Sequence, residues 1–184
     1  PETIEKTVVQ SGRIVDFKNQ AMLLNAFLKV HEKHTDYDLK IYGGNPFDGT
    51  LGKLQAIIRE NHAEDYIHLM GPSDSLEKEL PRAAVYAFSS DYEGMPNALI
   101  EAMALGMPVV ATDGPCGGPR TLINHEENGL LIPVGDEKAM EEGINRLIED
   151  RILAERLGKE ARNISKRVNG AAVLAQWKEY IEKV

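Results

Sequence analysis

The sequence predicts a doubly wound α/β domain, in which helices cover both faces of a mostly parallel sheet. Short apolar runs alternate along the chain with amphipathic segments of helical period. Most of these runs are apolar on successive residues, as in strands that are buried on both faces. No linker, low-complexity segment or internal repeat interrupts the pattern, so we expect residues 1–184 to form one domain.

The individual elements follow from these runs and from the Gly, Pro and polar residues that end them. The first helix, for example, is predicted over 19–31, because Leu23, Phe27 and Val30 recur at helical spacing. Asp136 and Asn169 are placed to cap two of the helices expected from Asp136 onward. The other helices are expected at 51–61 and 96–105, and the strands at 7–10, 39–42, 66–70, 84–88, 108–112 and 130–132.

Composition narrows the class of protein. Hydrophobic residues make up 42% of the 184-residue chain, enough for a core without disulfides, and the single cysteine, Cys116, suits a reducing cytoplasm. The net charge of −8 has the wrong sign for a general nucleic-acid binder. We find no run of the roughly 18–20 apolar residues that a membrane span needs. The chain begins at Pro1, as expected of a piece of a longer protein or of a chain that has lost its initiator methionine.

In a doubly wound sheet, ligands bind beyond the carboxyl ends of the strands. The densest signal at that edge follows the strand that ends at Phe88. Pro96 is expected to open a helix there, so the free amides around Met95, Asn97 and Ala98 form an anion site that suits phosphate. The loops expected at this edge are 11–18, 43–49, 71–75, 89–96 and 113–120.

Two glutamates flank this helix start. Glu93 lies just before it and Glu101 about a turn and a half inside it, and carboxylates readily accept hydrogen bonds from sugar or ribose hydroxyls. The spacing alone is equally consistent with a purely structural pair, in which Glu93 complements the helix dipole and Glu101 is a surface glutamate.

The surrounding residues carry a family resemblance. Glu-x7-Glu, with Gly-Met-Pro after the first Glu and Glu-Ala-Met-Ala-x-Gly-x-Pro from the second, resembles the carboxyl-terminal domain of glycosyltransferase family 4. Ser11-Gly12-Arg13 with Lys18-Asn19 resembles the family's first glycine-rich loop, and 128–133 resembles its later signature. The resemblance implies one half of a GT-B fold, in which two Rossmann-like domains face each other, and a retaining enzyme whose amino-terminal acceptor domain is absent from this chain.

The resemblance also implies a role for each matching residue. Arg13 and Lys18, in the loop of Gly12, would hold the donor diphosphate and stabilise it as a leaving group. Glu93 would contact the transferred sugar, and Glu101 the ribose of the nucleotide. The wall between the two glutamates, with backbone amides near the distal phosphate, would be formed by Gly94, Met95, Pro96, Asn97 and Ala98.

The resemblance implies no cofactor and no metal, because the substrate would be a nucleotide-diphosphate sugar whose charge is met by protein groups. The products would be polysaccharides or glycolipids, with contact to a membrane only through the acceptor or the other domain. The sequence does not name the sugar, the acceptor or the base, whether uracil, guanine or adenine. This chain also has Thr121 where the family often has a glutamate, which leaves the role of the 113–120 loop open.

Two rival functions remain. A nucleotide-sugar epimerase of the same fold would bind UDP-N-acetylglucosamine without releasing free UDP. A receiver-type signalling domain is also doubly wound, but it needs an acidic cluster after the first strand, where this chain has Ser11-Gly12-Arg13.

Other polar clusters are interpreted as structural. Asp36-Tyr37-Asp38 resembles a metal motif but precedes a strand, at the edge away from the ligand, so a turn is expected. His125, with Glu126 and Glu127, lies in an expected exposed loop. Near the end of the chain, a stripe is expected either to be core or to face the missing domain; it comprises Val173, Trp177, Tyr180, Ile181 and Val184.

Overall fold

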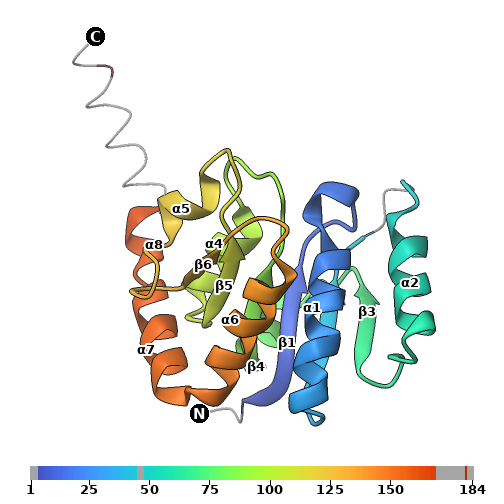
Figure 1. The fold of residues 1–184 in the computed structure, drawn as a ribbon. Helices are drawn as coiled ribbons and strands as arrows, with labels where there is room; N and C mark the ends of the chain where they lie inside the picture. The colour runs from blue at the N-terminus through green and yellow to red at the C-terminus, as the bar shows by residue number, and fades with distance from the viewer. Residues whose placement is uncertain (1–3, 45–47, 169–180, 182–184) are drawn as a thin grey trace.

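The computed structural model describes residues 4–44, 48–168 and 181 (Figure 1). Within them, six strands form one sheet in the order β3-β2-β1-β4-β5-β6, and every neighbouring pair is parallel. This confirms the predicted fold class and the position of each expected strand. The strands are β1 (Glu5–Ser11), β2 (Asp38–Tyr42), β3 (Ile67–Gly71), β4 (Ala83–Phe88), β5 (Val109–Thr112) and β6 (Leu130–Ile132).

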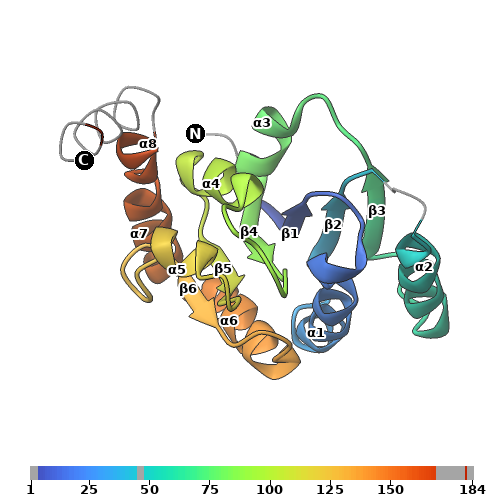
Figure 2. The same ribbon diagram turned by 90° about the horizontal axis from the view of Figure 1, so that it is seen from above.

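Helices cover both faces of the sheet. Figure 2 shows α1, α2 and α6 on one side of the strands and α3 and α4 on the other. The helices are α1 (Gln20–Lys33), α2 (Thr50–Glu60), α3 (Leu76–Glu79), α4 (Asn97–Ala104), α5 (Gly118–Leu122), α6 (Glu137–Glu149), α7 (Arg151–Ala161) and α8 (Ile164–Arg167), with single 3₁₀ turns η1 (Asp16–Lys18) and η2 (Leu80–Arg82).

The sheet divides the apolar side chains into two cores, because successive residues of a strand point to opposite faces. Val8 of β1 and Val85 of β4 pack in the core beneath α1 and α6. Val9 and Tyr86, the next residue in each strand, pack in the core beneath α4. All these side chains are buried, which explains why the strands read as continuous apolar runs.

The strand order positions the functional edge. β1 lies between β2 and β4, with Val9 opposite Tyr86. The segments that follow β1 and β4 therefore begin next to each other, but they lead to helices on opposite faces of the sheet (Figure 2). Such a reversal of winding opens a crevice at the carboxyl ends of the two strands.

Two local expectations need correction, one is confirmed, and two lie outside the described residues. Pro96 does not begin α4 but is its N-cap residue, with φ −82° and ψ 91°, so the helix starts at Asn97. The 113–120 loop is not wholly a loop, because α5 begins at Gly118. The cap at Asp136 is confirmed, since its Oδ1 accepts from the Ala139 amide at 2.9 Å. Asn169 and the terminal stripe lie outside the described residues, except for exposed Ile181.

Candidate functional site

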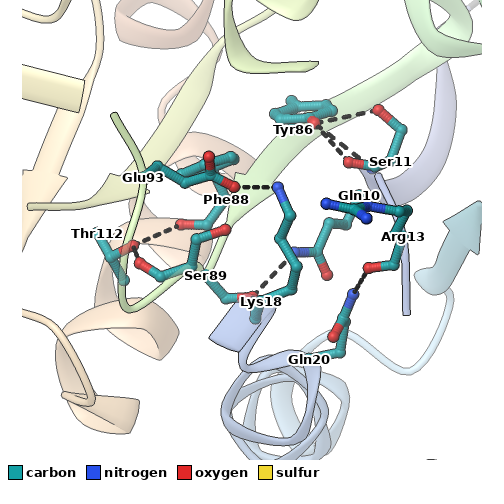
Figure 3. A network of polar contacts seen from close by, with 11 residues as sticks. Gln10, Ser11, Arg13, Lys18, Gln20, Tyr86, Phe88, Ser89, Glu93 and Thr112 are labelled. Atoms are coloured by element: carbon teal, nitrogen blue, oxygen red, sulfur yellow. Dashed lines mark hydrogen bonds and ion pairs between the residues drawn. The ribbon is translucent and has the colours of Figure 1, made fainter. Parts of the chain in front are cut away.

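The loops after β1 and β4 meet at the carboxyl edge and bring Arg13, Lys18 and Glu93 together (Figure 3). The Lys18 Nζ forms an ion pair with Glu93 Oε1. The two side chains are only 13% and 16% exposed, so water screens their charges much less than those of a surface pair. Lys18 Nζ also lies 5.6 Å from the centroid of the Phe88 ring. Residues 75 positions apart in the sequence thus build one small, partly dry, charged site.

A chain of buried polar groups fixes the backbone of Lys18. The Ser89 Oγ donates to the Lys18 carbonyl at 2.8 Å, and Gln10 Nε2 donates to Ser89 Oγ at 2.9 Å. Both Ser89 and Gln10 are buried, in the segment after β4 and within β1 respectively. The position of Lys18 therefore depends on the pairing of the two central strands.

Asn19 forms the second tie between the loops. Its φ of 46° is left-handed, a conformation that asparagine tolerates better than most residues, and it lets the side chain cap α1 through the Met22 amide. The Asn19 Nδ2 also donates to Asp91 Oδ1 at 2.7 Å. The Asp91 amide in turn donates to the Phe17 carbonyl at 2.9 Å. The loop carrying Lys18 and the loop carrying Glu93 are thus hydrogen-bonded to each other.

Arg13 supplies a second cation. Figure 3 shows its side chain extending toward that of Lys18. The side chain is exposed, and its guanidinium has no ion-pair partner among residues 4–44 and 48–168. The preceding Gly12 has a φ of +143°, and its amide donates to the Tyr42 carbonyl at 2.9 Å. Arg13 is therefore available to an anion, whereas Lys18 must share its charge with Glu93.

The amino terminus of α4 completes the anion-binding features. Its N-cap, Pro96, provides no side-chain hydrogen bond, so the first-turn amides at Asn97 and Ala98 receive no such partner. Gly94 and Met95, just before the helix, are exposed. Free amides at a positive helix end suit a phosphate group.

Glu101 lies on the exposed side of the second turn of α4. The negative charges of Glu101 and Glu93 both affect the pKa of the Tyr86 hydroxyl. Burial raises this pKa to about 12, and hydrogen bonds with Ser11 oppose the rise. The charges of Glu101 and Glu93 add to it. The Tyr86 hydroxyl is 3.1 Å from Ser11 Oγ. The charges of both glutamates thus reach the same buried phenol in β4.

The glycine-rich segment before α5 packs directly on the Glu93 loop, which the sequence did not reveal. A Cβ on Gly118 would lie 2.2 Å from the Gly94 carbonyl oxygen and 2.6 Å from that of Glu93. One on Gly114 would lie 2.9 Å from the Asp91 carbonyl oxygen. Only glycine permits this approach, so the segment acts as a support for the backbone of Glu93.

We expect Gly118→Ala to destabilise the chain by about 1–3 kcal/mol, because the two backbones must separate to admit a methyl group. Urea unfolding measures the change. The matched control is Gly52→Ala in α2, where a Cβ meets nothing within 4 Å; it should stabilise the helix by about 0.5–1 kcal/mol. Equal stabilities for Gly118→Ala and the unchanged chain would contradict the close packing.

A small cavity of about 250 Å³ opens at the carboxyl ends of β2 and β3. The backbones of Gly43, Gly44 and Gly71 form part of its wall, together with the side chains of Leu69 and Pro72. Gly43 is required here, since a Cβ on it would lie 1.8 Å from the Gly12 carbonyl oxygen. A wall of glycine backbone and apolar carbon suits a flat, weakly polar group.

The other polar clusters of the sequence lie elsewhere or have structural partners. Asp36 forms an ion pair with Lys6 near the amino-terminal edge of the sheet. His125 Nδ1 accepts from the Leu131 amide at 3.0 Å, next to a bridge between His125 and Gly129. Across the described residues, no group of three or more His, Cys, Asp or Glu side chains could hold a metal ion. Nor does any helix there have the length and apolar character to span a membrane.

Comparison with known proteins gives one consistent result. Residues 2–164 match the family described as glycosyl transferases group 1. An exopolysaccharide phosphotransferase of Streptomyces coelicolor is 34% identical over 95% of this chain and 18% of its own length. An undecaprenol-linked 4-alpha-N-acetylgalactosaminyltransferase of Campylobacter jejuni is 30% identical over 96% of this chain and 47% of its own.

A solved structure has the same fold, and the chain again matches only part of it. A point mutant of TarM of Staphylococcus aureus, in complex with fondaparinux, alpha-GlcNAc-glycerol and UDP, superposes with a TM-score of 0.88 at 28% identity. The match covers 97% of this chain and 36% of TarM. The chain thus spans less than half the length of each of these three proteins.

Proposed function

Because the chain belongs to the glycosyl transferases group 1 family, we propose that it is the donor-binding half of a retaining, metal-independent glycosyltransferase. It binds a nucleotide-diphosphate sugar, and the sugar passes to an acceptor hydroxyl with its anomeric configuration kept. The observation that carries the proposal is the pairing of Lys18 with Glu93 beside Arg13 and the amino terminus of α4. A cationic, partly dry crevice of this kind is where a diphosphate leaving group is best stabilised.

Each of these residues binds a different part of the donor. Arg13, Lys18 and the amides of Asn97 and Ala98 bind the diphosphate, as two permanent cations and a helix terminus together neutralise it. Glu93 contacts the sugar and stabilises the charge that develops at its ring. Glu101, further along α4, accepts from the ribose hydroxyls, and the flat cavity beside Gly43 and Gly71 takes the base.

The relatives support the wider context. The C. jejuni relative is named for an alpha-linkage formed on a diphospho-undecaprenol acceptor, and the S. coelicolor relative for exopolysaccharide. We therefore place this chain in polysaccharide or glycolipid synthesis. We further propose a cytoplasmic location, which the single cysteine suits, and an acceptor pocket on a separate amino-terminal domain of the whole enzyme. TarM, crystallised with UDP, supports a nucleotide as the shared ligand.

A thermal-shift screen against UDP-, GDP- and ADP-sugars tests the proposal. A ligand that binds only the folded state raises the midpoint of unfolding, and at a fixed concentration the rise grows with the logarithm of its affinity. We expect one base series to stabilise the chain, with free nucleoside diphosphate giving most of the shift. No shift with any nucleotide at millimolar concentration would contradict donor binding, and covalent phosphorylation without such a shift would favour a signalling domain.

Glu101→Ala is expected to weaken UDP binding about tenfold, as it removes a charged acceptor from the ribose. Calorimetry measures the affinity, and 2′,3′-dideoxy-UDP shows the cause, because this analogue should bind both proteins equally. Glu64→Ala, at an exposed acid before β3, serves as the control with unchanged affinity. Equal UDP affinity for Glu101→Ala and the unchanged chain would remove Glu101 from the site.

UDP binding is expected to persist in EDTA, with an affinity within about threefold of that in Mg²⁺, because protein groups already meet the diphosphate charge. Calorimetric titrations in the two buffers provide the measurement. An absolute requirement for Mg²⁺ or Mn²⁺ would overturn metal independence.

A further inference from the structure

A cluster of hydroxyl groups surrounds one carboxylate at the far end of this edge. Glu79, the last residue of α3, accepts hydrogen bonds at Oε1 from Ser73 Oγ at 2.8 Å and from Ser75 Oγ at 2.6 Å. The Tyr42 hydroxyl interacts with the same carboxylate. These hydrogen bonds, first those of Ser75 and Ser73 and then that of Tyr42, lower the pKa of Glu79, which therefore stays charged at neutral pH.

The cluster holds a loop rather than a helix end. Ser75 is the N-cap residue of α3, yet its side chain makes no capping bond and donates to Glu79 instead. The Ser75 amide is bonded to Ser73 Oγ at 3.1 Å. A helix that needed only an N-cap would use the Ser75 hydroxyl for that purpose. By contrast, Glu77 on the same short helix is exposed. The two serine hydroxyls that donate to Glu79 thus connect it to the loop 71–75 and do not cap the helix.

That loop forms one wall of the cavity at the ligand edge. Gly71 and Pro72 line the cavity, and the Gly71 carbonyl accepts from the Gly43 amide at 2.8 Å. The residue that follows, Ser73, is already bound to Glu79. Glu79 is therefore hydrogen-bonded to the residue next to Pro72, which lines the cavity.

The cluster also makes the charge along the ligand edge uneven. Its carboxylate interacts with the hydroxyl of Tyr42, the last residue of β2, whereas Arg13, Lys18 and the start of α4 provide positive charge in the segments that follow β1 and β4. Because the serine hydrogens point to Glu79, the serine oxygens can offer only lone pairs to a ligand. A nucleotide has an anionic end and a neutral end that carries N–H and O–H donors, so only one orientation satisfies both sides.

We propose that Glu79 is a positioning residue for the nucleoside part of the donor: through Ser73 and Ser75 it holds the loop 71–75 against the cavity and directs the neutral end of the nucleotide there. This inference rests on the proposed function. Glu79 does not touch the diphosphate, so its removal weakens the binding of nucleotides and leaves the binding of inorganic pyrophosphate unchanged.

The test compares two ligands on the same variants. We expect Glu79→Ala to weaken UDP binding about tenfold in calorimetric titrations, while the affinity for inorganic pyrophosphate stays within about twofold. Glu79→Gln, which keeps one carbonyl acceptor for a serine, should fall between Glu79→Ala and the unchanged chain. Glu77→Ala is the control on the same helix and should bind both ligands normally.

The outcomes separate this inference from the proposed function. If the unchanged chain binds no nucleotide, both are wrong. If it binds UDP and Glu79→Ala binds UDP equally well, the inference alone is wrong. An equal loss of UDP and pyrophosphate affinity would show a general disturbance of the edge, and it too would overturn the positioning role.

Discussion

Replacing Lys18 with alanine is expected to weaken UDP binding about 100-fold, more than any other single change at the ligand edge. The variant loses a charged hydrogen-bond donor to the diphosphate. It also leaves Glu93, only 16% exposed, as an unpaired carboxylate next to the phosphates. Both effects lower the affinity for an anion such as UDP. Arg13→Ala, which removes an exposed cation and frees no carboxylate, should cost only about tenfold.

A double-mutant cycle separates the two effects at Lys18. Glu93→Gln alone should bind UDP somewhat more tightly than the unchanged chain, because Lys18 no longer shares its charge. Lys18→Ala combined with Glu93→Gln should recover about tenfold of the lost affinity, because the unpaired carboxylate is gone. Calorimetry on the four proteins gives the coupling. If the double variant binds UDP as weakly as Lys18→Ala, the ion pair has no part in donor binding.

The isolated chain is expected to fold and to bind donor, but to transfer essentially no sugar. Glycosyl transfer needs the acceptor hydroxyl held against the anomeric carbon, and this alignment provides a large part of the rate. Closure between two domains also excludes water, which would otherwise compete as acceptor. The site found here is one edge of one sheet, and the chain spans less than half of its two relatives described above.

Product formation at saturating donor, with a panel of acceptors, measures this directly. Adding a separately expressed amino-terminal half is expected to restore some activity if the halves associate, and Glu93→Ala should abolish what is restored. Robust transfer by the chain alone that depends on Glu93 would show that the active site is complete without a second domain.

Much of this edge was predictable from local sequence. Period and composition give the six strands and α1, α2 and α4, because a buried parallel strand needs successive apolar residues. Once the strand order is assumed, Arg13, Lys18 and Glu93 fall in loops that leave neighbouring strands. The resemblance to a family then added roles for these residues that no spacing could supply.

The contacts between loops were not predictable, because they depend on tertiary packing. Gly117 and Pro119 made 113–120 read as a loop, yet Gly117 occupies the left-handed N-cap position and Pro119 the first turn of α5. The close approach of Gly118 to Gly94 has no local signal. The same holds for the ion pair of Lys18 with Glu93 and for the serines bound to Glu79.

One titration series shows whether this edge recognises a diphosphate attached to a nucleoside. The unchanged chain and the Arg13→Ala/Lys18→Ala double variant are each titrated with UDP and with uridine by calorimetry in EDTA. We expect the unchanged chain to bind UDP far more tightly than uridine. The double variant should lose this preference, while its weak affinity for uridine stays unchanged. Equal UDP affinity in the two proteins would show that Arg13 and Lys18 do not bind the diphosphate.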